Sequence, residues 1–228
     1  QTSDSSCEAC PTAGHVTVPG ATASTACFAS YTTYRLWVDA SYATDGIAVG
    51  TFKMFTSGGT QITTVCTVGV ASCTESNKYN TDYAASKCFN GVNTNSWHTP
   101  TNSISATDQW VQISFASPVA IPATYQLDAS RTQYSGQLVR RPKDFKLQGS
   151  NAVSPSADEN HADWTTLSTE TDGMPLDSQP YTFTTGCAAG TTGSIGSCTN
   201  CGTGKFKAAS GAAACSACPS NSGTTGTG

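Results

Sequence analysis

The middle of the chain alternates apolar and polar residues in short segments. Residues 34–40 show two faces that alternate at every position: Tyr34, Leu36, Val38 and Ala40 on one, Arg35, Trp37 and Asp39 on the other. Shorter segments of the same kind follow at 47–55, 109–115, 124–130, 144–150, 163–168 and 180–184. A period of two is typical of a strand that buries one face. Several such strands, with no convincing long helix, predict an all-β sandwich or jelly roll.

The composition favours strands over helices and limits the kinds of partner that the chain is expected to bind. Only 11% of the 228 residues are charged and the net charge is −4, against roughly 25% charged residues in typical soluble domains. Ser and Thr together make up roughly a quarter of the chain and Gly is abundant, which disfavours helices. A weakly acidic chain does not attract phosphate backbones, so we expect no nucleic-acid partner. No apolar run approaches the roughly 18–20 residues that span a bilayer, so we expect no membrane insertion.

The chain has 11 cysteines. Cytosolic proteins rarely carry so many unless they bind metal, so we expect a secreted or extracellular-surface protein. Both ends are rich in Cys, Gly, Thr and Ser and poor in large apolar residues, and such segments need covalent links to hold a structure. We therefore divide the chain into 1–30, 31–186 and 187–228. It starts at Gln1 without a signal peptide, which predicts a piece of a longer protein that continues in both directions.

The two ends resemble each other. Each contains Cys-x-x-Cys, then a Gly-containing stretch, then another Cys, and the words "CEACP" and "CSACP" are nearly identical. This pattern resembles the Cys-rich repeats of ephrin-receptor-like and growth-factor-receptor-like ectodomains. If neighbouring cysteines of such repeats pair, the disulfides are Cys10–Cys27, Cys187–Cys198 and Cys201–Cys215. Cys7 and Cys218 then need partners outside this chain.

Three cysteines remain in the middle of the chain. Cys66 and Cys73 close the short loop "CTVGVASC", which leaves Cys88 as a buried free thiol. A zinc site is the alternative at the C-terminal end, because four cysteines there have nearly zinc-ribbon spacing: Cys198, Cys201, Cys215 and Cys218. The same CxxCP word at Cys7 has no second pair nearby, which favours disulfides.

The central segments also resemble a known family in their order. "YRLWVDASYATDGIAVGTFKMFTSGGTQIT" looks like the opening strands of the discoidin, or coagulation-factor type C, domain. "AASKCFNGVNTNSWHT" is similar to that family's alanine-lysine-alanine-phenylalanine-aspartate-glycine loop. "DQWVQISFASPVAI" and "RRPKDFKLQGSN", followed by "DWTTL", resemble its later strands. The resemblance implies a galactose-binding-like jelly roll whose loops at one end recognise glycans, lipids or proteins.

The Asn-Gly loop raises the question of calcium. In carbohydrate-binding members of the family this loop holds a structural Ca²⁺, and the resemblance places Asn90, Asn93 and Asn95 as its side-chain ligands here. Ca²⁺ takes six to eight oxygens, and amide oxygens bring no charge, so binding is weaker than with carboxylates. The alternative is an ion-free loop that the amides themselves hold together. Trp97 is expected to be a core residue beneath the loop.

The resemblance also suggests ligand contacts. Lectins of this fold use His and Arg for hydroxyl groups and an aromatic ring for the sugar face, which points to Arg131, Tyr134 and His98, with Arg140 and Arg141 nearby. The competing interpretation is structural. Arg131 then braces a strand end, and Arg140, Arg141 and Lys143 form a solvated edge.

The expected function follows from comparing three classes of protein: an enzyme, a structural or adhesive module, and a lectin. None of the three histidines, His15, His98 and His161, lies in a metal or nucleophile motif, and neither Gly-x-Ser-x-Gly nor HExxH occurs, so we expect no enzyme. We expect a structural or adhesive module of a large secreted, filament-forming glycoprotein. Its partners would be other copies or domains of the same protein, glycans or extracellular matrix. A lectin-like, calcium-dependent module is the alternative.

Overall fold

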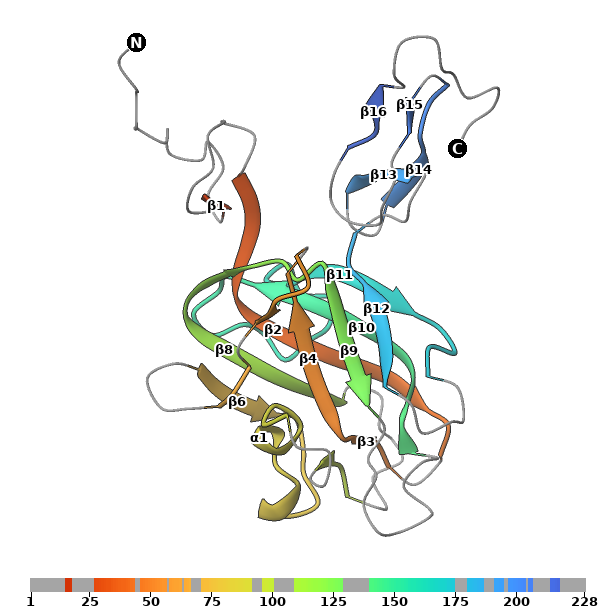
Figure 1. The fold of residues 1–228 in the computed structure, drawn as a ribbon. Helices are drawn as coiled ribbons and strands as arrows, with labels where there is room; N and C mark the ends of the chain where they lie inside the picture. Colours follow the sequence, from red (N-terminus) through yellow and green to blue (C-terminus); the bar gives the residue numbers. More distant parts are fainter. Residues whose placement is uncertain are drawn as a thin grey trace.

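The computed structural model confirms the all-β class (Figure 1). It describes residues 15–17, 27–43, 46–56, 58–62, 64–66, 71–91, 96–100, 109–128, 140–174, 180–186, 191–194, 197–203, 205–206 and 214–217. All strand pairs in this part of the chain are antiparallel. Its helical elements are two short ones, η1 (Thr81–Tyr83) and α1 (Ala85–Cys88). Neither approaches the length or the apolar character that crossing a bilayer would require.

Two antiparallel sheets form the sandwich. The larger one has the order β11 (Thr165–Glu170), β10 (Pro142–Ser150), β2 (Cys27–Ser41), β8 (Gln109–Ala120) and β6 (Ala71–Glu75), and β1 (His15–Thr17) also pairs with β2. The smaller one has the order β12 (Tyr181–Thr184), β9 (Thr124–Asp128), β4 (Thr51–Phe55) and β5 (Gln61–Ile62). Three short pairs complete the described strands: β3 (Ala48–Val49) with β7 (Trp97–His98), β13 (Thr191–Ser194) with β14 (Ser197–Asn200), and β15 (Lys205–Phe206) with β16 (Ser216–Ala217).

The core lies between the two sheets. Most positions of the predicted inward faces are confirmed, although Ala40 is only half-buried. The buried apolar residues of β2, β4, β8, β9 and β10 are Tyr34, Leu36, Val38, Phe52, Met54, Val111, Ile113, Tyr125, Leu127, Phe145 and Leu147. Aromatic rings join the layers. The rings of Phe145 and Phe183 lie 5.1 Å apart, and those of Tyr125 and Phe183 lie 5.2 Å apart. Trp97 is fully buried in the same core, as predicted.

The chain enters and leaves the sandwich at one end. Ser30 at the start of the sandwich pairs with Ala120, and Thr184 pairs with Thr124, only four residues further along the chain. β1 and β13–β16 lie at this end (Figure 1). β3, β7 and α1 lie at the opposite end, which we call the distal end (Figure 1). The described strands of the Cys-rich segments, β1 and β13–β16, therefore lie away from the distal end.

Candidate functional site

The distal end gathers several of the residues that the sequence singled out. The pairing of β3 with β7 sets Ala48 opposite His98 and Val49 opposite Trp97. β9 ends there at Asp128, and β10 begins there after Arg140 and Arg141. The segment 129–139, which carries Arg131 and Tyr134, lies outside the described residues. Both its flanking residues, Asp128 and Arg140, belong to the distal end.

His98 forms the centre of a small aromatic cluster. Its ring centroid lies 5.8 Å from that of Tyr79 and 5.4 Å from that of Tyr83. Its side chain is almost fully buried, whereas Tyr79 is 52% exposed. Arg140 Nη1 lies 2.9 Å from His98 Nε2. A guanidinium can only donate, so Nε2 is the acceptor of this hydrogen bond. The surface groups of this cluster are the Tyr79 ring and parts of Tyr83 and Arg140.

The two neighbouring arginines differ in exposure. Arg140 is half-buried and contacts His98, whereas Arg141 is completely buried. The guanidinium carbon of Arg141 lies 5.1 Å from the ring centroid of Tyr42, which suits a cation–π contact. The interpretation of Arg141 as part of a solvated edge was therefore wrong. Alternation did not reveal the burial, because Arg141 precedes the strand. Its side chain braces the distal end from within.

Calcium stays a prediction. Asn93 and Asn95 lie outside the described residues, and Asn90 is half-buried beside Gly91. Gly91 has φ +74°, the left-handed conformation that a tight turn in this loop requires. The donor set predicted from the sequence contains no carboxylate, so its chemistry fits a hard divalent ion only weakly.

The cysteines separate into three groups. Disulfides join Cys66 to Cys73 and Cys201 to Cys215. Cys88 is free and buried, and its Sγ lies 3.2 Å from the carbonyl oxygen of Ala85. The remaining predicted partners are not described: Cys7, Cys10, Cys187 and Cys218 entirely, and Cys27 and Cys198 in their side chains. Because Cys201 and Cys215 are bonded to each other, they are not available as thiolates to the alternative zinc site.

A second candidate site lies on the outer face of the larger sheet. Arg35 points away from the core, yet it is completely buried beneath residues 151–164, the loop between β10 and β11. Its guanidinium carbon lies 3.7 Å from the ring centroid of Trp164 and 4.6 Å from that of Trp37. The cation is thus held between two indole rings.

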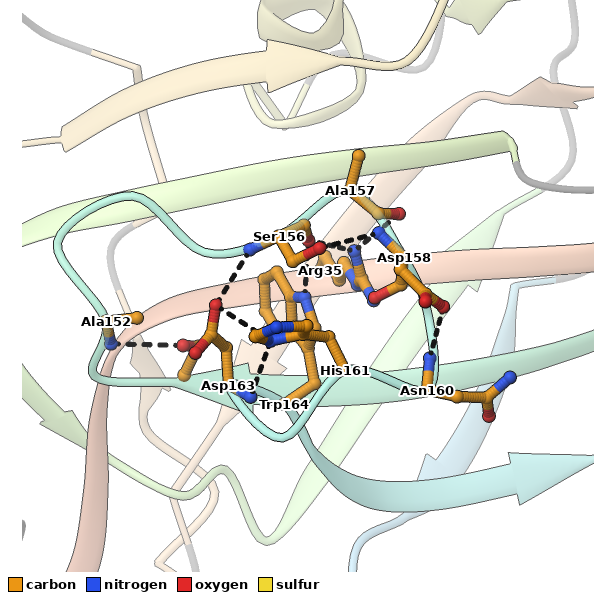
Figure 2. Close-up of polar contacts among 10 residues, drawn as sticks. Arg35, Ala152, Ser156, Ala157, Asp158, Asn160, His161, Asp163 and Trp164 are labelled. Atoms are coloured by element: carbon orange, nitrogen blue, oxygen red, sulfur yellow. Dashed lines mark hydrogen bonds and ion pairs between the residues drawn. The ribbon is translucent and has the colours of Figure 1, made fainter.

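Arg35 also fixes the course of that loop (Figure 2). It donates hydrogen bonds to three consecutive backbone carbonyls, those of Ser156, Ala157 and Asp158. Its Nε donates to Gln148 Oε1 at 2.7 Å, and Gln148 in turn donates to the carbonyl of Glu159. Burial lowers the pKa of Arg35 to about 10, so the guanidinium stays charged at neutral pH. We call residues 151–164 the Arg35-bound loop.

The loop adds hydrogen bonds of its own. Trp164 Nε1 donates to the Ser156 carbonyl at 2.7 Å, and the Ser156 amide donates to Asp163 Oδ2 (Figure 2). The Asp158 amide donates to Ser156 Oγ, and the Asn160 amide donates to Asp158 Oδ1. These contacts give a surface loop a defined backbone, which long irregular loops usually lack.

An ion-paired group lies beside the loop. Lys146 Nζ lies 2.7 Å from Glu159 Oε1 and 3.5 Å from Asp39 Oδ2. Burial and a hydrogen bond to Glu159 raise the pKa of Asp39. Burial alone would raise the pKa of Glu159, but hydrogen bonds from Lys146 and Asp39 outweigh it and lower that pKa. Trp37 Nε1 donates to Asp39 Oδ1, so the group also fixes the indole ring.

The alternation and motifs of the sequence do not single out this second site. The sequence does contain an indication of the Arg35 site, since Arg35 and Trp37 occupy the outer positions of a strand and Trp164 follows a polar segment. No family model matches the chain, and no curated protein or solved structure is significantly similar to it.

Proposed function

We propose that this chain is a non-enzymatic structural and adhesive module of a large secreted, filament-forming glycoprotein. The observation that supports this role is the arrangement of the ends. The chain enters at Ser30 and leaves at Thr184 on one side of the sandwich. The distal end, with Tyr79 and Arg140, lies on the other. A module built in this way joins its neighbours in the chain at one end and contacts other molecules with the other.

The segments beyond the sandwich support the same role. β13–β16 form two small antiparallel pairs, and a disulfide joins Cys201, shortly before β15, to Cys215, directly before β16. Small segments of this kind derive their stability from covalent links rather than from a core. Repeated along a longer protein, they act as stiff, protease-resistant spacers. The resemblance to discoidin domains and Cys-rich ectodomain repeats agrees with this role. The partners would be other copies or domains of the same protein, glycans or extracellular matrix.

Electron microscopy tests the proposal. Negative-stain images of the native material, before and after reduction, should show ordered filaments that fray when the disulfides are reduced. A distal-end variant, Tyr79→Ala with Arg140→Ala, should assemble poorly, whereas Val153→Ala, an exposed residue on another surface, should assemble normally. Dispersed monomers in the native material would contradict the filament role.

Carbohydrate binding is the second candidate function. The outer face of the larger sheet favours it, because tryptophan, amide and carboxylate side chains line one groove there.

A further inference from the structure

A groove of about 510 Å³ opens on the outer face of the larger sheet, between the Arg35-bound loop and the residues that flank β6 and β8. Its volume falls within the range of small-ligand sites, roughly 300–1,000 Å³. It lies on a sheet face and adjoins the distal end through Asn77, whose carbonyl oxygen accepts a hydrogen bond from Trp97 Nε1 at 2.9 Å. We propose that this groove binds a neutral sugar residue of a glycan.

The floor of the groove is aromatic. Trp37 on β2 and Trp110 on β8 are cross-strand partners, so their side chains project from the same face of the sheet. Trp37 is buried under the loop, whereas Trp110 is only half-buried. An indole beside a groove presents a flat apolar surface with a negative face. The C–H face of a pyranose ring matches such a surface.

The near rim of the groove, formed by the residues that flank β6 and β8, offers hydrogen-bond donors. Gln109 and Asn77 carry side-chain amides, and Ser76 Oγ donates to Gln109 Oε1 at 3.1 Å. Asn77 Oδ1 accepts from the Lys78 amide at 2.9 Å. Each amide oxygen accepts one hydrogen bond within the protein and keeps a second lone pair, whereas each NH₂ group carries two donors. The two amides therefore offer mainly donors to a ligand.

The far rim of the groove, formed by the Arg35-bound loop, offers hydrogen-bond acceptors. Asp158 and Glu159 come from the Arg35-bound loop, and ionised carboxylates can only accept. Glu159 is engaged with Lys146, so Asp158 is the exposed carboxylate of this rim. Arg35 holds the carbonyl of Asp158 at 3.1 Å, and the Asn160 amide holds Oδ1 at 2.9 Å (Figure 2). The acceptor rim is therefore pre-organised, which reduces the entropy lost on binding.

Because one rim of the groove carries donors and the other carries acceptors, the groove favours a ligand that can both donate and accept hydrogen bonds. A hydroxyl group both donates and accepts, so a polyol satisfies both rims at once. An ammonium group would satisfy the carboxylates and leave the amide NH₂ groups without an acceptor. An anionic sugar would meet the charge of Asp158 at close range. An uncharged pyranose is thus the best match. The inference rests on the second candidate function, which it makes specific, and not on the structural role, because a filament module and an isolated one would bind a sugar equally.

Calorimetric titration of the whole chain, with its disulfides intact, tests the proposal. The probes are neutral trisaccharides of glucose, galactose, mannose, xylose and N-acetylglucosamine, with trigalacturonate and trilysine for comparison. At least one neutral trisaccharide should bind with a Kd of about 0.1–10 mM, the range of single weak sites. Trp110→Ala should weaken that binding about tenfold or more. Asp158→Asn and Gln109→Ala, which alter exposed or half-buried groups only, should weaken it about three- to tenfold.

Two controls make the outcome decisive. Tyr79→Ala removes an exposed aromatic residue at the distal end and should leave the affinity unchanged. Thermal unfolding of each variant identifies any that fails to fold. The proposal is overturned if no neutral trisaccharide binds, if trilysine is the probe that binds, or if binding survives both Asp158→Asn and Trp110→Ala. Loss of binding in Tyr79→Ala alone would move the sugar site to the distal end. None of these results depends on whether filaments form.

Discussion

On the inner face of the larger sheet, Leu36 and its apolar neighbours lie against the side chains of the smaller sheet. On the outer face of the same strand, Arg35 and Trp37 lie beneath the Arg35-bound loop. Both faces are buried, but the inner one excludes water with apolar volume and the outer one does so with a cation, two indoles and backbone carbonyls. The difference matters for function, since only the outer face combines a fixed backbone with polar groups at its margin.

The largest expected effect comes from removing the cation. Arg35→Ala removes the donor of Gln148 Oε1 and of the Ala157 and Asp158 carbonyls, leaves the Ser156 carbonyl with Trp164 Nε1, and opens the space between Trp37 and Trp164. We expect a loss of about 4 kcal/mol in the free energy of unfolding, because unpaired buried polar groups cost more than the bonds themselves contribute. Denaturant titration measures it. A loss below about 1 kcal/mol would mean that the loop does not depend on Arg35.

Truncation on the inner face should cost slightly less. Leu36 is completely buried, and Leu36→Ala should lower the free energy of unfolding by about 3 kcal/mol through lost burial and a cavity. The loop on the outer face should stay protected from proteolysis in this variant, in contrast to Arg35→Ala. Equal proteolysis of residues 151–164 in the two variants would show that the faces are not independent.

Conservative substitutions should distinguish the apolar inner face of the larger sheet from its polar outer face more sharply. Leu36→Met keeps the volume and should cost under about 1.5 kcal/mol. Arg35→Lys keeps the charge but loses the planar fork that reaches several carbonyls, and should cost about 2 kcal/mol. Denaturant titration of both variants gives the comparison. If Arg35→Lys costs no more stability than Leu36→Met, the positive charge alone explains how the outer face holds the loop.

The smallest effect is a pH dependence at the margin of the loop. The pKa of Glu159 is lowered in the folded protein, so its ionised form stabilises the fold above its unfolded pKa, and that contribution is lost as the pH falls through the folded pKa. The stability difference between wild type and Glu159→Gln should therefore narrow from pH 7 to below the usual pKa of Glu, about 4.3. Thermal unfolding across this range measures it. A constant difference would exclude Glu159 as the titrating group.

The alternation of residues predicted the inner face because a period of two places Tyr34, Leu36 and Val38 together without reference to the rest of the chain. The same alternation could not predict the outer face. Burial of Arg35 depends on contacts with residues more than 110 positions away, in a loop whose composition is that of a solvated turn. The Trp37–Trp110 pairing likewise requires the strand order and register of β2 and β8, which short segments do not specify.

The distal end was predicted in part. The sequence pointed to His98 and Arg140, and the fold brings them within hydrogen-bonding distance. It did not indicate that His98 would be buried beneath Tyr79 and Tyr83, because these residues come from a different segment, which is joined to β7 by the hydrogen bond from the Tyr79 amide to the His98 carbonyl.

Hydrogen exchange of the wild-type protein tests the central claim most directly, that Arg35 turns the 151–164 segment into a fixed wall of a groove. The informative amides are those of Ser156, Asp158, Asn160 and Trp164, which donate within the loop. We predict that they exchange far more slowly than exposed amides and lose this protection in Arg35→Lys. Rapid exchange of these amides in the wild type, at the rate of an unstructured loop, would contradict the account.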